Sequence, residues 1–206
     1  MTFFRAVGRF FKEQFSLPMV NPLLGKENCV ACTLAAIKTM TSGRKYFAAP
    51  DAPTETFDRI VKLLGIQHSL KVQQLVGRYW HTEAIERWLD MVYPVSEAAL
   101  PQHFFIAVAE ADDHSRSGQE VFAHALYGFR YRDRTKGEIV TKVLNTQNGS
   151  SVIKKGTFSK VGATIINPSL LTSRVLNKYR VFRQPGASEI KISKRKKSKM
   201  ISRRAT

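Results

Sequence analysis

The sequence predicts a single α+β domain, in which helices of the first half pack on an antiparallel sheet formed by the second half. Apolar residues recur at helical intervals up to residue 92, whereas Phe, Val, Ile and Tyr dominate three segments after residue 102. A length of 206 residues, 43% of them hydrophobic, suffices for one well-buried core and excludes a wholly disordered or fibrous protein. No apolar run approaches the roughly 20 residues of a membrane-spanning helix.

The first predicted helix lies within residues 1–20. Phenylalanines recur on one of its faces and cations on the other, and Pro18 ends it. We expect this amphipathic helix to dock on the domain, and a helix lying on a membrane surface is the alternative. The segment lacks the continuous apolar stretch and the small-residue cleavage site of a secretory signal peptide.

Three more helices are predicted before the sheet. Asn28 is a good N-cap for a helix that runs to about Met40 and stops at Gly43. The segments Thr54–Leu64 and Thr82–Val92 each carry an apolar stripe, and Trp88 is expected in the core.

The second half predicts an antiparallel sheet, because β-branched and aromatic residues dominate it. The strands are expected at residues 103–109, 121–131 and 138–145, with a later short strand at 178–182. Residues 134–137 predict the hairpin turn between the second and third of these strands.

Positive charge is the unusual property of the composition. The chain has 33 Lys and Arg against 16 Asp and Glu, a net charge of +17, and residues 188–206 hold eight of the cations and one Glu. The segment 187–206, with its cations at Lys191–Arg204, therefore predicts a disordered basic tail after a folded domain at 21–186. Such a tail favours nucleic acid, an anionic lipid surface or an acidic partner, and a merely solubilising role is equally compatible.

Cys29 and Cys32 lie at the start of the second predicted helix. A thiol at a helix N-terminus meets unpaired backbone N–H groups and the positive end of the helix dipole, which lower the thiol pKa and favour the thiolate. We therefore expect Cys29 to be a nucleophile and Cys32 to be a buried packing residue. A redox pair and half of a zinc site are the alternatives. A redox motif needs a preceding strand and zinc needs further ligands, which the sequence does not indicate, so no metal or other cofactor is expected.

A nucleophilic thiol needs a base and a group that orients the base. His124 lies in an apolar segment, where an imidazole is unusual, although a satisfied core histidine is the simpler interpretation of that residue alone. Pairing of the strands on either side of the predicted turn brings Asn145 within a few residues of His124. The Asn145 carbonyl would accept from one ring N–H and leave the other nitrogen for the thiol. Cys29, His124 and Asn145 are thus a candidate catalytic set for attack on an acyl carbon.

These residues resemble the papain-fold toxin domains of bacterial polymorphic toxins, a family often described as glutamine deamidases. In the first half, the resemblance rests on Asn28-Cys29-x-x-Cys32, an alanine-rich helix, Gly43 and Ala48-Ala49-Pro50. In the second half, it rests on His124-Ala125 and on Asn145-Thr146-Gln147-Asn148-Gly149, which is similar to the family's Asp-Gly-Gln-x-Gly turn. The motifs cover residues 25–50 and 121–149.

The resemblance implies a papain-like cysteine hydrolase fold in which Cys29 is the nucleophile, His124 is first base and then acid, and Asn145 orients the imidazole. Asn145 stands where the family more often has Asp. Gln147 would line the site or aid oxyanion binding, with a structural role in the turn as the alternative. No glutamine precedes the cysteine at the position that papain-like enzymes use for the oxyanion. The backbone N–H of Cys29, aided by Asn28, Asn21 or Gln14, would serve instead.

The expected function is hydrolysis of an amide in a protein or peptide, by glutamine deamidation or peptide cleavage, and a cell-wall peptidase of the same chemistry is a further candidate. By resemblance, the chain would be a bacterial toxin or effector, with an immunity protein as a partner, and either cytoplasmic or delivered without a signal peptide. The alternative from another class is a basic module that binds nucleic acid or an anionic membrane without catalysis, in which both cysteines are packing residues.

Overall fold

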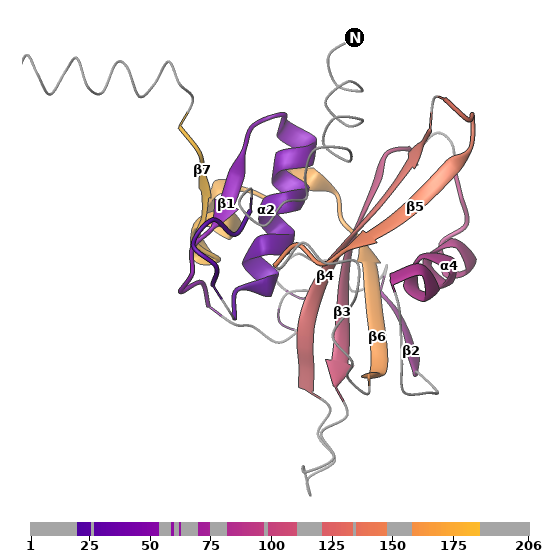
Figure 1. Ribbon diagram of the computed structural model, residues 1–206, viewed down its shortest axis with the longest axis horizontal. Helices are drawn as coiled ribbons and strands as arrows, with labels where there is room; N and C mark the ends of the chain where they lie inside the picture. The colour runs from indigo at the N-terminus through magenta and orange to yellow at the C-terminus, as the bar shows by residue number, and fades with distance from the viewer. Residues whose placement is uncertain are drawn as a thin grey trace, which may run out of the picture.

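Figure 1 shows a computed structural model of the chain, which describes residues 20–25, 27–53, 59, 62, 70–74, 82–96, 99–110, 121–133, 135–147 and 158–185. Its elements are α2 (Cys29–Ser42), β1 (Tyr46–Ala48), β2 (Lys71–Gln74), α4 (Thr82–Val92), β3 (Gln102–Glu110), β4 (Val121–Arg132), β5 (Ile139–Leu144), β6 (Phe158–Ile165), the short 3-10 helix η3 (Pro168–Leu170), α5 (Ser173–Lys178) and β7 (Val181–Arg183). The expected helix within residues 1–20 and the basic tail lie outside the described residues. So does the helix Thr54–Leu64, apart from Arg59 and Lys62, which are both helical.

The predicted α+β class with an antiparallel sheet is confirmed. Five strands form one antiparallel sheet in the order β2-β6-β3-β4-β5, and β1 pairs with β7 in a separate two-stranded ribbon. The strands predicted at 103–109, 121–131 and 138–145 are present as β3, β4 and the edge strand β5, within one or two residues of their expected ends, and so is the hairpin between β4 and β5. Strands β1, β2 and β6 were not predicted, because they are short or lie in segments without a clear alternation of apolar and polar residues.

The predicted strand at residues 178–182 is wrong in its first half. Helix α5 occupies Ser173–Lys178 and therefore includes the first residue of the expected strand. Thr172 caps this helix, because its hydroxyl accepts a hydrogen bond from the Val175 N–H at 3.4 Å. Arg180 then adopts a left-handed conformation (φ 52°), and only after this turn does the chain extend into β7.

The large sheet lies between two helical layers (Figure 1). Alternate residues of β3 and β4 face opposite sides: Phe105, Ala125 and Tyr127 pack under α2, whereas Ile106 and Leu126 pack under α4. Each helix thus covers one core of the sheet. Cys29, at the start of α2, packs against the core between α2 and the sheet. Within the described part of the chain, no helix is long and apolar enough to cross a bilayer.

Helix α2 is buried on almost every side, as its Ala, Ile, Leu and Val content requires. Gly43 ends it as predicted, with φ 66° and its N–H bonded to the Thr39 carbonyl at 3.2 Å. The helix runs past the predicted Met40 because the hydroxyls of Thr41 and Ser42 bond back to carbonyls one turn earlier, at 2.9 and 2.7 Å, instead of stopping it.

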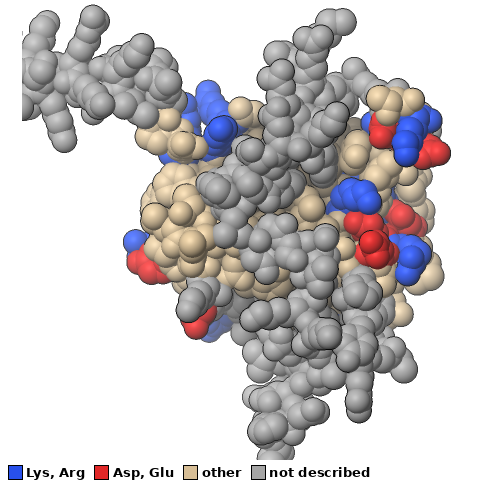
Figure 2. Space-filling view, viewed as in Figure 1, with Lys and Arg blue, Asp and Glu red and all other residues tan. Residues whose placement is uncertain are grey.

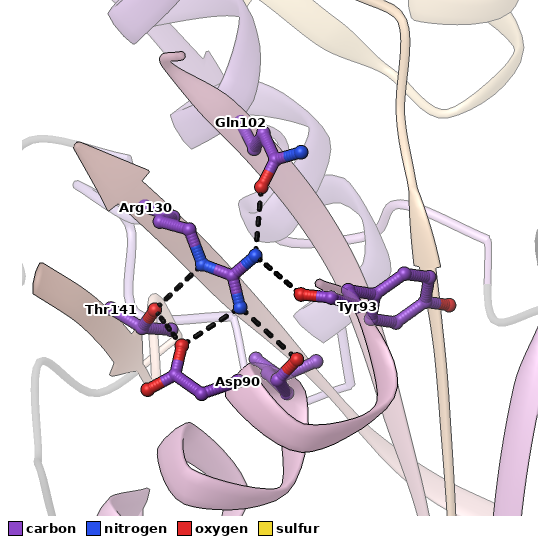
Figure 3. Close-up of polar contacts among 6 residues, drawn as sticks. Asp90, Tyr93, Gln102, Arg130 and Thr141 are labelled. Atoms are coloured by element: carbon purple, nitrogen blue, oxygen red, sulfur yellow. Dashed lines mark hydrogen bonds and ion pairs between the residues drawn. The ribbon is translucent and has the colours of Figure 1, made fainter. Parts of the chain in front are cut away.

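Helix α4 has the bounds that the sequence predicts, with Trp88 buried in the core. Its C-terminal end is held by Arg130 of β4, which is completely buried (Figure 3). The guanidinium donates to the Leu89 and Tyr93 carbonyls at 3.0 and 2.8 Å and forms an ion pair with Asp90 at 2.8 Å. It also donates to the side chains of Gln102 and Thr141, both at 2.9 Å. The buried cation therefore adds a second donor to the Leu89 carbonyl, which already accepts from the Tyr93 N–H at 3.0 Å, and supplies a donor to the Tyr93 carbonyl just beyond the helix.

On the other face of the sheet, a neutral histidine is buried under α2. His103 is 3% exposed, its Nδ1 lies 2.9 Å from the Tyr127 hydroxyl, and its ring stacks on Phe129 at 5.1 Å. Burial lowers the pKa of His103 from 6.5 to about 4, because a charged imidazole would lose its hydration there.

We expect His103 to make the fold sensitive to acid. Its folded-state pKa lies below the unfolded value, so its stabilising effect is complete above pH 6.5 and is lost as the pH falls from 6.5 towards 4. The loss amounts to about 3 kcal/mol of unfolding free energy. Urea unfolding at several pH values should show this decline in the native protein and a flatter profile in His103→Gln, whose amide retains a partner for Tyr127. Equal declines in both proteins would exclude His103 as the cause.

Candidate functional site

The structure places Cys29 at the first residue of α2, where the helix meets β4. The side chain is half-buried, and the thiol lies against the backbone of Ala125, which hydrogen-bonds to the sulfur. Ala125 is small, so the helix start approaches the strand closely. Cys32 is completely buried, and burial together with the nearby Cys29 raises its pKa to about 12, in line with its predicted role as a packing residue.

The expected low pKa of Cys29 is wrong. Burial raises the pKa of this thiol above its usual 9.0, and this effect outweighs the hydrogen bonds from the backbone of Ala125, Val30 and Cys29 itself, which lower it. Helix α2 begins where the sequence predicts, but desolvation destabilises the thiolate more than the backbone N–H groups at the helix start stabilise it. Cys29 is therefore a neutral thiol at neutral pH, and its activation requires a base.

Asn28 occupies the N-cap position, but its side chain does not cap the helix, contrary to prediction. Instead the Asn28 Nδ2 donates to the Ala49 carbonyl and to the Asn21 Oδ1, each at 3.0 Å, and the residue is completely buried. The Asn28 side chain thus joins the loop before Cys29 to the segment that follows β1.

Asn21 forms the centre of a cluster of amides, which we call the amide cluster: Asn21, Gly25, Asn28 and Gln147. The Asn21 Oδ1 accepts from the N–H of Gly25 at 3.0 Å as well as from Asn28, and its Nδ2 donates to the Gly25 and Gln147 carbonyls at 3.1 and 2.9 Å. All hydrogen-bonding groups of this buried side chain are used. These bonds hold the turn at residues 21–25, in which Leu24 has a positive φ of 53°.

Gln147 links the amide cluster to the turn after β5. Its Nε2 donates to the Gly25 carbonyl and to the Asn28 Oδ1, both at 3.3 Å. Close by, the hydroxyls of Thr33 in α2 and Thr146 lie 3.4 Å apart. The residues expected from sequence to aid the site, Asn28 and Gln147, are therefore in contact although they are far apart in the chain.

Gly25 is required at the middle of the cluster. A Cβ on Gly25 would lie 2.5 Å from the Asn28 Nδ2 and 2.7 Å from the Cα of Pro50, which no real side chain tolerates. The close packing of these backbones explains why Gly25, Asn28 and the sequence Ala48-Ala49-Pro50 occur together.

His124 immediately precedes Ala125 in β4 and is half-buried. It pairs with Val108 of β3, and the register shifts directly beside it, because Phe122 rather than Ala123 opposes Ala109. By alternation, position 124 belongs to the face of Leu126, under α4, whereas Cys29 reaches the strand from the α2 side. Cys29 and His124 are therefore close to the same part of the β4 backbone, but their side chains lie on opposite faces of the sheet.

Asn145 follows the last residue of β5 and is buried. Because Leu144 pairs with Tyr127, Asn145 comes next to Leu126, two residues from His124. Within the described part of the chain, its side-chain oxygen accepts from the Gln147 N–H at 3.2 Å, and the expected hydrogen bond to His124 is not formed. The oxygen is used to close the turn by which the chain leaves the sheet.

Sequence reasoning placed Cys29, His124 and Asn145 in one region but missed the residues that hold them there. Asn21 was named only as an aid to the oxyanion and Gly25 only as the limit of a motif. The available signal was the short segment Asn21–Gly25 with its Pro and Gly, which indicates a turn, while its bonds to Gln147 depend on the fold. Among the described residues, no three His, Cys, Asp or Glu side chains gather to hold a metal ion.

The chain was compared with protein-family models, curated proteins and solved structures, and no match was found in any of the three.

Proposed function

We propose that this protein is a cysteine-dependent amide hydrolase with a papain-like catalytic arrangement. The observation that carries the proposal is the position of the Cys29 thiol: at the start of α2 and against the backbone of Ala125, the residue that follows His124 in β4. A thiol at a helix start can attack an acyl carbon once a base comes within hydrogen-bonding distance of it, and we assign that role to His124.

The amide cluster supports the proposal because it fixes the loop before Cys29 relative to the turn that carries Asn145 and Gln147. Catalytic groups must be held within a fraction of an ångström, and buried, fully bonded side chains provide that rigidity. The cluster thus accounts for Asn28 and Gln147 as positioning residues, and Gln147 keeps its place beside the cysteine loop.

His124 acts as a general base in this mechanism. Because the Cys29 thiol is neutral, the imidazole takes the thiol proton as the sulfur attacks the amide carbon. His124 lies on the α4 face of β4 and Cys29 on the α2 face, so the proposed step requires the imidazole to turn around the edge of β4 beyond Leu144, where β5 has left the sheet. Asn145, two positions away across the strands, would orient the ring once it exchanges the Gln147 N–H for a ring N–H.

The remaining steps follow from the chemistry of a thioester. Backbone N–H groups at the start of α2 stabilise the oxyanion, and the tetrahedral intermediate collapses as His124 returns its proton to the departing nitrogen. Ammonia leaves if the amide is a glutamine side chain, and an amine leaves if it is a peptide bond. Water then attacks the thioester, which releases a carboxylate and restores the thiol. A bacterial toxin or effector that acts on a protein substrate is the biological role that agrees with this chemistry and with the resemblance.

Alkylation of the two cysteines by iodoacetamide tests the proposal. Cys29 is expected to react much faster than the buried Cys32, and His124→Ala is expected to slow Cys29 about 100-fold near pH 7 by removing its base. Because the Cys29 pKa is raised above 9.0, the rate in His124→Ala should increase with pH up to and beyond pH 9, and the loss should shrink there. Mass spectrometry of each cysteine-containing peptide measures both rates.

His103→Gln is the control, because this second buried-strand histidine lies in β3, away from Cys29, and bonds to Tyr127. It should leave Cys29 alkylation unchanged at neutral pH. Slow and equal labelling of both cysteines, unaffected by His124→Ala, would remove the basis of the hydrolase proposal.

A further inference from the structure

The ribbon of β1 and β7 carries an aromatic pair outside both cores, in which Phe182 is exposed and Phe47 is half-buried. Phe47 and Phe182 are directly opposite each other in the register, with ring centroids 5.9 Å apart. Their strand neighbours Ala48 and Val181 face inwards and pack on the α2 core, so the two rings lie on the outer face of the ribbon. Phe182 is 41% exposed, which is unusual for so large an apolar side chain.

Cations surround one end of this pair. Arg44 and Lys45 immediately precede β1, Arg183 ends β7, and all three are exposed. The Gln184 N–H bonds to the Lys45 carbonyl at 2.8 Å, which brings the two strand ends together. In Figure 2 the basic side chains at upper left, where Figure 1 shows the end of β7, have no acidic side chain beside them. At the opposite end of the ribbon, Arg180 is paired with Asp51 at 2.6 Å.

The α4 and β5 side of the face drawn in Figure 2 differs from this end of the ribbon. On the α4 and β5 side, basic and acidic side chains alternate in Figure 2, and Lys142 pairs with Glu86 at 3.6 Å. The chain leaves the ribbon at Pro185 and continues in sequence into residues 188–206, with eight Lys or Arg and one Glu. Among the described residues, Arg44, Lys45 and Arg183 are thus exposed cations next to the Phe47–Phe182 pair.

We propose that this surface, formed by Phe47, Phe182, Arg44, Lys45 and Arg183, binds single-stranded nucleic acid. Cations that follow a phosphate backbone and an exposed ring on which a base stacks are the two features that such binding requires. The surface offers two aromatic rings on a short ribbon, which suit a base, and it lacks the wide apolar face by which a protein inserts into lipid. This binding is independent of the proposed hydrolysis, because neither Cys29 nor the amide cluster belongs to the ribbon.

Fluorescence anisotropy of a labelled oligo-dT with the full-length chain tests the inference. Phe182→Ala should weaken binding about fivefold or more, whereas Phe182→Trp should preserve it, because a base can stack on the indole ring but not on alanine. The double variant Lys45→Gln with Arg183→Gln should reduce the slope of log affinity against log salt by about 1.4, since each phosphate contact to a single strand contributes about 0.7. Thermal unfolding of each variant shows whether it is folded.

Lys136→Gln, an exposed cation in the β4–β5 hairpin, is the charge-matched control and should change neither quantity when substituted alone. Three results would overturn the inference: binding that Phe182→Ala does not affect, a loss in Lys136→Gln equal to that in Lys45→Gln alone, or no binding of oligo-dT at all. Binding of phosphatidylserine vesicles that depends on Phe182, without binding of the oligonucleotide, would instead assign the surface to a membrane.

Discussion

Replacement of Cys29 by alanine is expected to reduce amide hydrolysis by about 1,000-fold or more, because the covalent route through the thioester disappears with the sulfur. The side chain is only half-buried and a Cys to Ala change removes a single atom, so the free energy of unfolding should change little. Two assays separate the reactions: ammonia release from a blocked glutaminyl dipeptide for deamidation, and new amino termini in casein for peptide cleavage.

Cys32→Ala provides the matched control for this prediction. Cys32 lies in the same helix but is completely buried, so its loss should lower stability slightly and leave turnover in place. If Cys29→Ala retained the activity of the native protein, the nucleophile would have to be another group, and the mechanism above would be wrong even if the protein proved to be a hydrolase.

Replacement of Arg130 by alanine should lower the free energy of unfolding by about 3–5 kcal/mol, the largest stability effect that we expect from a single side chain. The change removes the Arg130 donor from the Tyr93 carbonyl and from the Gln102 side chain inside the core, whereas the Leu89 carbonyl keeps the Tyr93 N–H. It also opens a cavity between α4 and the sheet. The positive charge that holds the C-terminal end of α4 is also lost. Urea unfolding followed by circular dichroism measures the change.

Two further substitutions identify which contribution dominates. Asp90 is half-exposed, so Asp90→Asn should cost about 1 kcal/mol or less, because water already screens much of that ion pair. Arg132→Ala, two residues along the same strand at an exposed position, should cost about 0.5 kcal/mol at most. An Arg130→Ala protein as stable as Arg132→Ala would mean that the buried hydrogen bonds contribute nothing net.

The raised pKa of Cys29 bears directly on the proposed mechanism. A thiolate held permanently by a helix terminus would react without assistance, whereas a buried neutral thiol depends on the base beside it. The dependence on His124 is therefore stronger than the sequence alone indicates, and the alkylation experiment measures it.

Much of the fold follows from local patterns. Helix α4 begins and ends where its apolar stripe and Pro94 predict, and Gly43 stops α2. Strands β3, β4 and β5 are long and rich in β-branched and aromatic residues, so composition locates them. The three-residue strands β1 and β7 carry too few residues for any pattern, and each becomes a strand only because the other lies beside it.

The candidate site divides in the same way. Residue chemistry was enough to single out a thiol at a helix start, a histidine in an apolar strand and an amide after the next strand. The loop before the thiol is held by distant partners: the Ala49 carbonyl is 21 residues from Asn28, and the Gln147 carbonyl is 126 residues from Asn21. Such bonds leave no local trace in a single sequence.

The chain's own residue order thus establishes an α+β domain, the bounds of its regular helices and the kinds of chemistry that its side chains offer, because these depend on neighbours within a few positions. Folding alone decides that Asn28 bonds to the amide cluster instead of capping α2, that Asn145 closes a turn, and that the Cys29 pKa is raised. Burial and partners such as the Ala49 carbonyl, 21 residues from Asn28, are properties of the packed molecule. The Asn145 bond spans only two residues, but the fold decides that the side chain makes this bond and not one to His124.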